Sequence, residues 1–148
     1  MTKRISKLDR AIDFAFAKLK RVGDPDKLPP PFQAIVRVVA AQGVIDNGGF
    51  QFFFESDWPD QPPYTVFIDA YREIGADDEA ELLADAVRMF PFADPHKFLR
   101  RRNEFLNRFQ GQDDSPFWTY DHAFCESSNE VERLLERYVR KHAAAFSP

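Results

Sequence analysis

The feature that most constrains this chain is a double glycine followed at once by phenylalanines, Asp-Asn-Gly-Gly-Phe-Gln-Phe-Phe-Phe at residues 46–54. The apolar pattern of residues 32–45 is helical, and glycine and asparagine adopt a positive φ more readily than other residues. We therefore expect Asn47 or Gly48 to end this helix as a left-handed cap. Gly48 or Gly49 is expected to have a positive φ.

The phenylalanines that follow the double glycine have helical spacing. Phe50, Phe53 and Phe54 lie at i, i+3 and i+4, which places them on one face of a short helix. Large aromatic side chains at this spacing are most simply core residues, so the segment predicts a tight turn that directs rings into the core. The predicted structural motif comprises Asn47, Gly48, Gly49, Phe50, Phe53 and Phe54.

The composition is that of an ordinary soluble protein, with 148 residues, 44% of them hydrophobic and 30% charged. This length fits one domain over residues 1–148. A single cysteine, Cys125, rules out an internal disulfide and fits a reducing compartment. No segment approaches the length of a membrane span. We therefore expect a cytoplasmic protein that does not contact a membrane.

Apolar residues recur at steps of three and four along most of the chain, which predicts helices. The expected helices cover 4–22, 31–46, a short phenylalanine segment after residue 49, 63–74, a segment capped by Asp77 or Asp78, a segment opened by Asp94-Pro95, and a last helix capped by Ser127 or Ser128. Residues 111–116 form a polar break, and residues 117–126 are expected to be irregular. Helix 31–46 is apolar nearly all round, so we expect it to be central. The predicted fold is a compact all-α domain of about seven helices.

Acidic side chains gather in the helix predicted after Gly75. Asp77, Glu81 and Asp85 lie at i, i+4 and i+8, so about 6 Å separates consecutive members along one face. That separation is near the spacing of phosphates along one DNA strand. The candidate protein-binding residues are Asp77, Asp78, Glu79, Glu81 and Asp85. Acids at a helix start also favour the helix dipole, so a purely structural role is the alternative.

Basic side chains gather at Arg100, Arg101 and Arg102, with Arg108 nearby. These arginines would neutralise the acidic helix if the two helices were neighbours. Clusters of charge are more often solvated surface than functional sites. The sequence leaves open whether the acidic face is free or neutralised.

No motif for catalysis or for metal or cofactor binding is present. His96, His122 and His142 are too far apart in the sequence to form a helical metal site. Asp121, His122 and Cys125 lie close together, but adjacency supplies neither an orienting group nor an oxyanion site. The simpler interpretation is a buried aromatic segment with a small apolar cysteine. We expect no catalytic residue, no metal and no cofactor.

Three groups of residues resemble a known family. They are the segment DNGGFQFFFES, the segment YTVFIDAYREIGADDEAELLADAVRMF and the ending VERLLERYVRKHAAAF. The matching positions are Asn47, Gly48, Gly49, Phe50, Ile74, Gly75, Ala76, Tyr138 and Phe146. Over roughly residues 30–146 the chain resembles the bacterial DNA-mimic-protein-like (DMP-type) family, a domain of unknown function. The resemblance implies an all-helical fold. For the member that gives the family its name, it implies a dimer whose carboxylates imitate DNA phosphates and occupy a DNA-binding protein.

Two functions of different classes follow. The first is a non-enzymatic interaction protein that binds a DNA-binding or other basic protein through its acidic helical face, does not bind nucleic acid directly, and is a candidate homodimer. The second is a small enzyme or ligand-binding domain with an aromatic pocket near Trp58, Trp118, Tyr120 and His122. A deep pocket with convergent polar groups would favour the second function.

Overall fold

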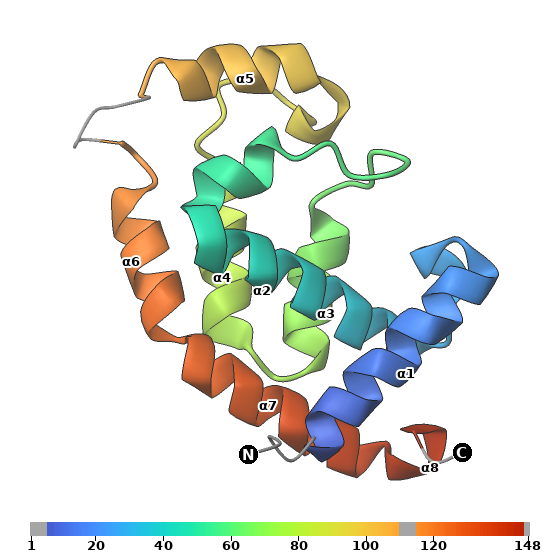
Figure 1. The fold of residues 1–148 in the computed structure, drawn as a ribbon. Coiled ribbons are helices and arrows are strands. Elements are labelled where there is room, and N and C mark those ends of the chain that lie inside the picture. Colours follow the sequence, from blue (N-terminus) through green and yellow to red (C-terminus); the bar gives the residue numbers. More distant parts are fainter. Residues whose placement is uncertain (1–5, 110–114, 147–148) are drawn as a thin grey trace, which may run out of the picture.

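The computed structural model describes residues 6–109 and 115–146, and all regular structure in this part of the chain is helical (Figure 1). The all-α prediction is therefore confirmed. The helices are α1 (Lys7–Val22), α2 (Pro30–Glu55), α3 (Thr65–Glu73), α4 (Asp77–Val87), α5 (Leu99–Asn107), α6 (Trp118–Glu126), α7 (Ser128–Lys141) and α8 (Ala143–Phe146), with 3-10 turns at Pro25–Lys27 and Pro95–Lys97. Most of the predicted polar break at residues 111–116 lies outside the described residues.

Helix α2 is the centre of the fold, as its apolar sequence predicts. It contacts α1, α3, α5, α6 and α7, and the other helices surround it in Figure 1. Ile35, Val38, Ala41 and Ile45 are fully buried along its length. Because α2 has apolar residues on nearly every side, it can be packed on several faces at once.

The double glycine bends α2 and does not end it. Asn47 and Gly48 keep helical geometry, so the predicted left-handed cap at either of them is wrong. Gly49 has φ 71° and ψ −170°, a backbone region that only glycine adopts easily. The predicted positive φ within the pair is therefore confirmed, at Gly49. The helix resumes directly after Gly49 and runs to Glu55.

The phenylalanines after the bend form the middle of the core, as predicted. Phe50, Phe53 and Phe54 are all fully buried. Ring centroids lie 5.2 Å apart between Phe50 and Phe124 of α6, and 5.3 Å apart between Phe53 and Phe67 of α3. The bend thus lets Phe50 and Phe53 face rings from two different helices. Edge-to-face pairs of this kind add to the free energy gained by burial.

The helix ends agree with the sequence in part. Gly23 ends α1 and Gly75 follows α3, each with positive φ, so both helices end at a glycine of the sequence. Asp77 and Asp78 do not cap α4, because the N-cap residue is Ala76 and both acids lie in the first turn. Ser127 holds the N-cap position of α7, but its hydroxyl donates to the carbonyl of Phe124 instead of capping the helix.

Two segments after α4 differ from expectation. Asp94-Pro95 opens only a 3-10 turn, and α5 begins later, at Leu99. Residues 117–126 were expected to be irregular, yet Trp118–Glu126 form the regular helix α6. The prediction of irregular structure is therefore wrong. Only Phe124 of this helix is fully buried, so its sequence lacks the wide apolar stripe by which a helix is recognised.

Candidate functional site

The acidic residues of α4 have three different environments. Asp77, Asp78 and Glu81 are exposed, and Asp85 is half-buried. Glu79 is only 4% exposed because it lies on the core-facing side beside Ala80 and Leu83, so a partner cannot reach it. Of the five candidate residues, four therefore remain at or near the surface.

Arginines close to α4 neutralise part of this stripe. Arg72 of α3 lies 3.0 Å from a carboxylate oxygen of Glu81 and 3.7 Å from one of Asp69. Arg88, just after α4, forms an ion pair with Asp85. Asp77 and Asp78 form no ion pair with the residues that the structure describes. These two carboxylates are the unpaired part of the α4 stripe.

The arginine run of α5 does not cover α4. Arg102 is 2% exposed and its guanidinium donates to the backbone carbonyls of Phe54, Pro95 and His96 over 2.8–2.9 Å. Arg100 pairs with Glu104 on its own helix, and Arg101 lies 4.2 Å from the ring centre of Phe92. The alternative in which this run neutralises the acidic helix is therefore wrong. Arg102 instead ties α5 to the end of α2.

The bend of α2 is joined to α6 by Asp121. The backbone N–H of Phe50 donates to Asp121 Oδ1 over 2.7 Å. A Cβ at Gly49 would lie 2.9 Å from this carboxylate, so only glycine leaves room for it. Burial raises the pKa of Asp121 above its ordinary value of 3.8, although the hydrogen bond from Phe50 lowers it. The bend and Asp121 thus require each other.

A hydrogen-bonded network surrounds Asp46, one turn before the bend. Gln42 Nε2 and the Ser128 hydroxyl donate to Asp46 Oδ1 over 3.0 and 2.9 Å. The Tyr71 hydroxyl donates to Gln42 Oε1 over 2.8 Å. Burial raises the pKa of Tyr71 well above 10.0, and the carboxylates of Asp46 and Glu79 raise it further. Helices α2, α3 and α7 are therefore linked around one exposed carboxylate.

Cys125 and His122 do not form a nucleophile–base pair. His122 Nε2 lies 3.0 Å from Glu126, and its ring stacks on Trp118 with centroids 5.6 Å apart. Cys125 is exposed, which corrects the expectation of a buried cysteine. Burial of part of the thiol raises the pKa of Cys125, and Asp46 and Asp121 raise it further. The thiol is therefore held protonated, which is the opposite of what a nucleophile requires.

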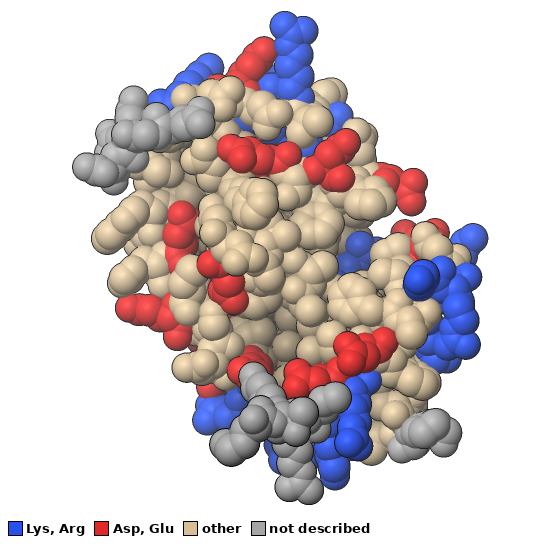
Figure 2. Space-filling model, in the orientation of Figure 1, with Lys and Arg blue, Asp and Glu red and all other residues tan. Residues whose placement is uncertain are grey.

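The same carboxylates define a surface that we call the α2–α6 acidic face. It comprises Asp46, Asp121 and Glu126, with the exposed aromatic side chains of Phe52 (45% exposed) and Trp118 (60% exposed). No Lys or Arg occurs in residues 38–71 or 109–132, which include α2 after Arg37 and the whole of α6. Figure 2 shows carboxylates over α2 and α6 among uncharged side chains, with Lys and Arg over α1 and at the upper and lower ends. The absence of Lys and Arg from these two long segments is the sequence signal that would have located this face.

The aromatic residues predicted to line a ligand pocket contact different parts of the molecule. Trp58 packs on Phe53 and Phe67, with ring centroids 5.5 and 4.8 Å apart. Trp118 stacks on His122 at the surface. Two cavities of the described structure, one bordered by Val139 and Phe146 and the other by Val66 and Glu73, are lined by neither tryptophan nor by His122. Trp58 and Trp118 therefore contact different partners and share neither of these two cavities.

Among residues 6–109 and 115–146, no group of three or more His, Cys, Asp or Glu side chains could hold a metal ion. None of the helices described has the length and apolar character needed to cross a membrane.

The fold and the acidic face define an all-α protein with a carboxylate-rich surface built around a glycine bend. The family described as DMP19-like protein matches residues 26–142. The chain belongs to the DMP19-like family. Comparison with curated proteins and with solved structures found no match.

Proposed function

We propose that this chain is a non-enzymatic interaction protein that binds a basic, nucleic-acid-binding protein and offers carboxylates where DNA would offer phosphates. The observation that carries the proposal is the α2–α6 acidic face, where no Lys or Arg lies in the two segments that build it. A negatively charged surface attracts a basic partner and speeds its association. Membership of the DMP19-like family is consistent with this role.

Exposed aromatic side chains support protein binding over a purely electrostatic role. Trp118 and Phe52 are large and exposed, and Trp118 stacks on His122, which pairs with Glu126 of the face. Aromatic residues are enriched among the residues that supply most of the binding free energy in protein interfaces. The same negative charge repels nucleic acid, so a nucleic acid is a poor ligand for this surface.

Helix α4 supplies a second, smaller candidate surface. Asp77 and Asp78 have no ion pair among the described residues, whereas Glu81 and Asp85 are paired with arginines. A partner that bound α4 would compete with Arg72 and Arg88 for these carboxylates. The α2–α6 acidic face has no Arg or Lys partner among the described residues, and Glu126 pairs there with His122. For this reason we propose the α2–α6 acidic face as the main contact surface and the start of α4 as an accessory one.

We also propose that the protein works in the cytoplasm and forms a homodimer. The single cysteine fits a reducing compartment, which supports a cytoplasmic location. A homodimer would double the number of carboxylates presented to a partner. Sedimentation of the purified chain over a concentration series measures its oligomeric state, and a monomer at every concentration would contradict the proposed homodimer.

The test uses wild-type chain and two variants that each lose two negative charges. The face variant is Asp46→Asn with Glu126→Gln, and the α4 variant is Asp77→Asn with Asp78→Asn. Asp121 is left unchanged because it holds the α2 bend. Each immobilised chain is incubated with lysate of the source cell at low salt, and bound proteins are quantified by mass spectrometry. We expect a basic DNA-binding protein on wild type and on the α4 variant and its loss from the face variant. Equal recovery on all three chains would contradict the proposal.

A further inference from the structure

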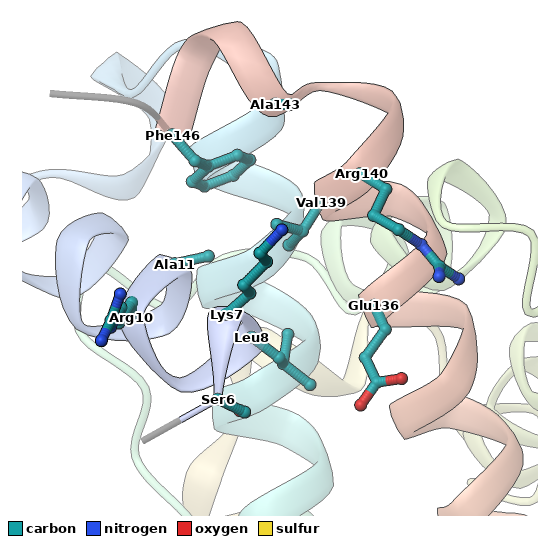
Figure 3. A pocket seen from close by; sticks show the side chains of 10 residues that line it. All are labelled: Ser6, Lys7, Leu8, Arg10, Ala11, Glu136, Val139, Arg140, Ala143 and Phe146. Carbon is teal, nitrogen blue, oxygen red and sulfur yellow. The ribbon is translucent and has the colours of Figure 1, made fainter. Parts of the chain in front are cut away.

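A cavity between α1, α7 and α8 lies on the side of the molecule away from α6, and the proposed function does not use it (Figures 1 and 3). Its volume is about 510 Å³. Small-molecule sites typically occupy about 300–1,000 Å³. The cavity is therefore large enough for a ligand of roughly ten to twenty heavy atoms.

The floor of the cavity is apolar. Leu8 and Ala11 of α1 and Val139 of α7 are nearly fully buried and line it. Phe146 points from α8 toward the centre of the cavity in Figure 3, and its ring packs against Phe32 with centroids 5.0 Å apart. The floor is thus held by three helices and offers hydrocarbon contacts but few hydrogen-bonding groups.

The rim carries an excess of positive charge in a chain whose net charge is −4. Lys7, Arg10 and Arg140 line the cavity together with one carboxylate, Glu136. In Figure 3 the Lys7 side chain crosses the opening toward Val139, and Arg10 and Arg140 lie on opposite sides. All three cations are exposed, and none forms an ion pair with a residue that the structure describes. Their charge is therefore available to an anion.

An apolar floor below a cationic rim fits one chemical class of ligand. We propose that the cavity binds a small amphipathic anion, a medium-chain carboxylate whose hydrocarbon chain lies on the floor and whose head group meets Lys7. The stem of Lys7 covers apolar surface and leaves its ammonium at the opening, where a carboxylate can accept a charge-assisted hydrogen bond. Arg10 and Arg140 add to the positive potential on both sides. This inference concerns a different surface from the proposed protein contact and does not depend on it.

The test is calorimetric titration of the full-length chain with decanoate, kept below the concentration at which it forms micelles. We expect saturable binding of one decanoate per chain, with decanol at least tenfold weaker because it lacks the charge. A Lys7→Gln/Arg140→Gln variant should bind decanoate at least tenfold more weakly. A matched Lys20→Gln/Lys141→Gln variant, which loses the same charge from the same two helices outside the cavity, should stay within twofold of wild type.

Thermal unfolding of both variants shows whether they remain folded, and charge changes at exposed positions should leave it nearly unchanged. Four results would overturn the inference. They are no heat of binding up to about 1 mM decanoate, equal affinity for decanol, equal affinity of the Lys7→Gln/Arg140→Gln variant, and binding of many decanoate molecules per chain. Tighter binding of an acidic amphipathic peptide, lost in the same variant, would assign the cavity to a protein partner instead.

Discussion

Replacement of Gly49 by alanine tests the link between the α2 bend and Asp121. Gly49 has φ 71° and ψ −170°, and a new Cβ would lie 2.9 Å from the Asp121 carboxylate. An L-residue in this backbone region is strained by about 1–3 kcal/mol. The carboxylate must also move, which leaves the buried N–H of Phe50 without its acceptor.

The magnitude follows from these two effects. A buried donor without a partner costs about 1–3 kcal/mol. Together with the backbone strain, the Gly49→Ala variant should lose about 2–6 kcal/mol of the free energy of unfolding. That is a large part of the total stability of about 5–15 kcal/mol expected of a small domain.

Urea unfolding followed by far-ultraviolet circular dichroism measures this loss. The control is Gly43→Ala in the same helix, where a Cβ meets no atom within 4 Å. This change should stabilise the chain by about 0.5–1 kcal/mol, since alanine favours helix over glycine. In an Asp121→Ala background, Gly49→Ala should cost only the backbone strain, about 1–3 kcal/mol. The same loss in both backgrounds, or a Gly49→Ala variant as stable as wild type, would refute the reasoning.

Three further outcomes are expected. Phe53→Ala should lower the free energy of unfolding by about 3–5 kcal/mol because the ring is fully buried. Phe52 is exposed, so Phe52→Ala should change the free energy of unfolding by about 0.5 kcal/mol or less, and equal effects of the two variants in urea unfolding would contradict this prediction. Alkylation of Cys125 by iodoacetamide should reach half its maximal rate above pH 9.0, and Asp46→Asn should lower that midpoint; an unchanged midpoint would show that the face has no negative potential there. Because the pKa of Asp121 is raised, the folded state binds the proton of this carboxyl more tightly than the unfolded state does. The stability of wild type relative to Asp121→Asn should therefore fall as pH rises from below 3.8 through the raised pKa, and a stability difference independent of pH would contradict the raised pKa.

Local patterns were sufficient to predict the framework of this fold. The helical spacing of Phe50, Phe53 and Phe54 identified core residues, and the apolar character of residues 31–46 identified the central helix. The positive φ was predicted at Gly48 or Gly49 without a choice between them, and the helix end predicted at Asn47 or Gly48 was wrong. The positive φ lies at Gly49, beside Asp121 from a helix far along the chain, and this contact is not visible in the sequence spacing.

The candidate site depended on contacts that sequence spacing does not contain. Glu79 is one residue from exposed Asp78, yet its direction on α4 places it in the core. Arg102 belongs to a basic run but is buried, because three backbone carbonyls at the end of α2 and in the 3-10 turn need a donor. Local charge density therefore suggested α4 as the acidic surface. The long segments without Lys or Arg were a better guide to the α2–α6 acidic face.

The central claim is that the α2–α6 acidic face occupies the DNA-binding surface of a basic protein. The most direct measurement is a competition in which a fluorescent DNA duplex, bound to the DNA-binding protein captured by the wild-type chain, is titrated with wild type, the face variant or the α4 variant. We expect wild type to displace the duplex, with an affinity that falls steeply as salt rises. The face variant should need at least about tenfold more protein, equivalent to ~1.4 kcal/mol, and the α4 variant should stay close to wild type. Simultaneous binding of chain and duplex, or displacement that the face variant achieves as well as wild type, would contradict the account.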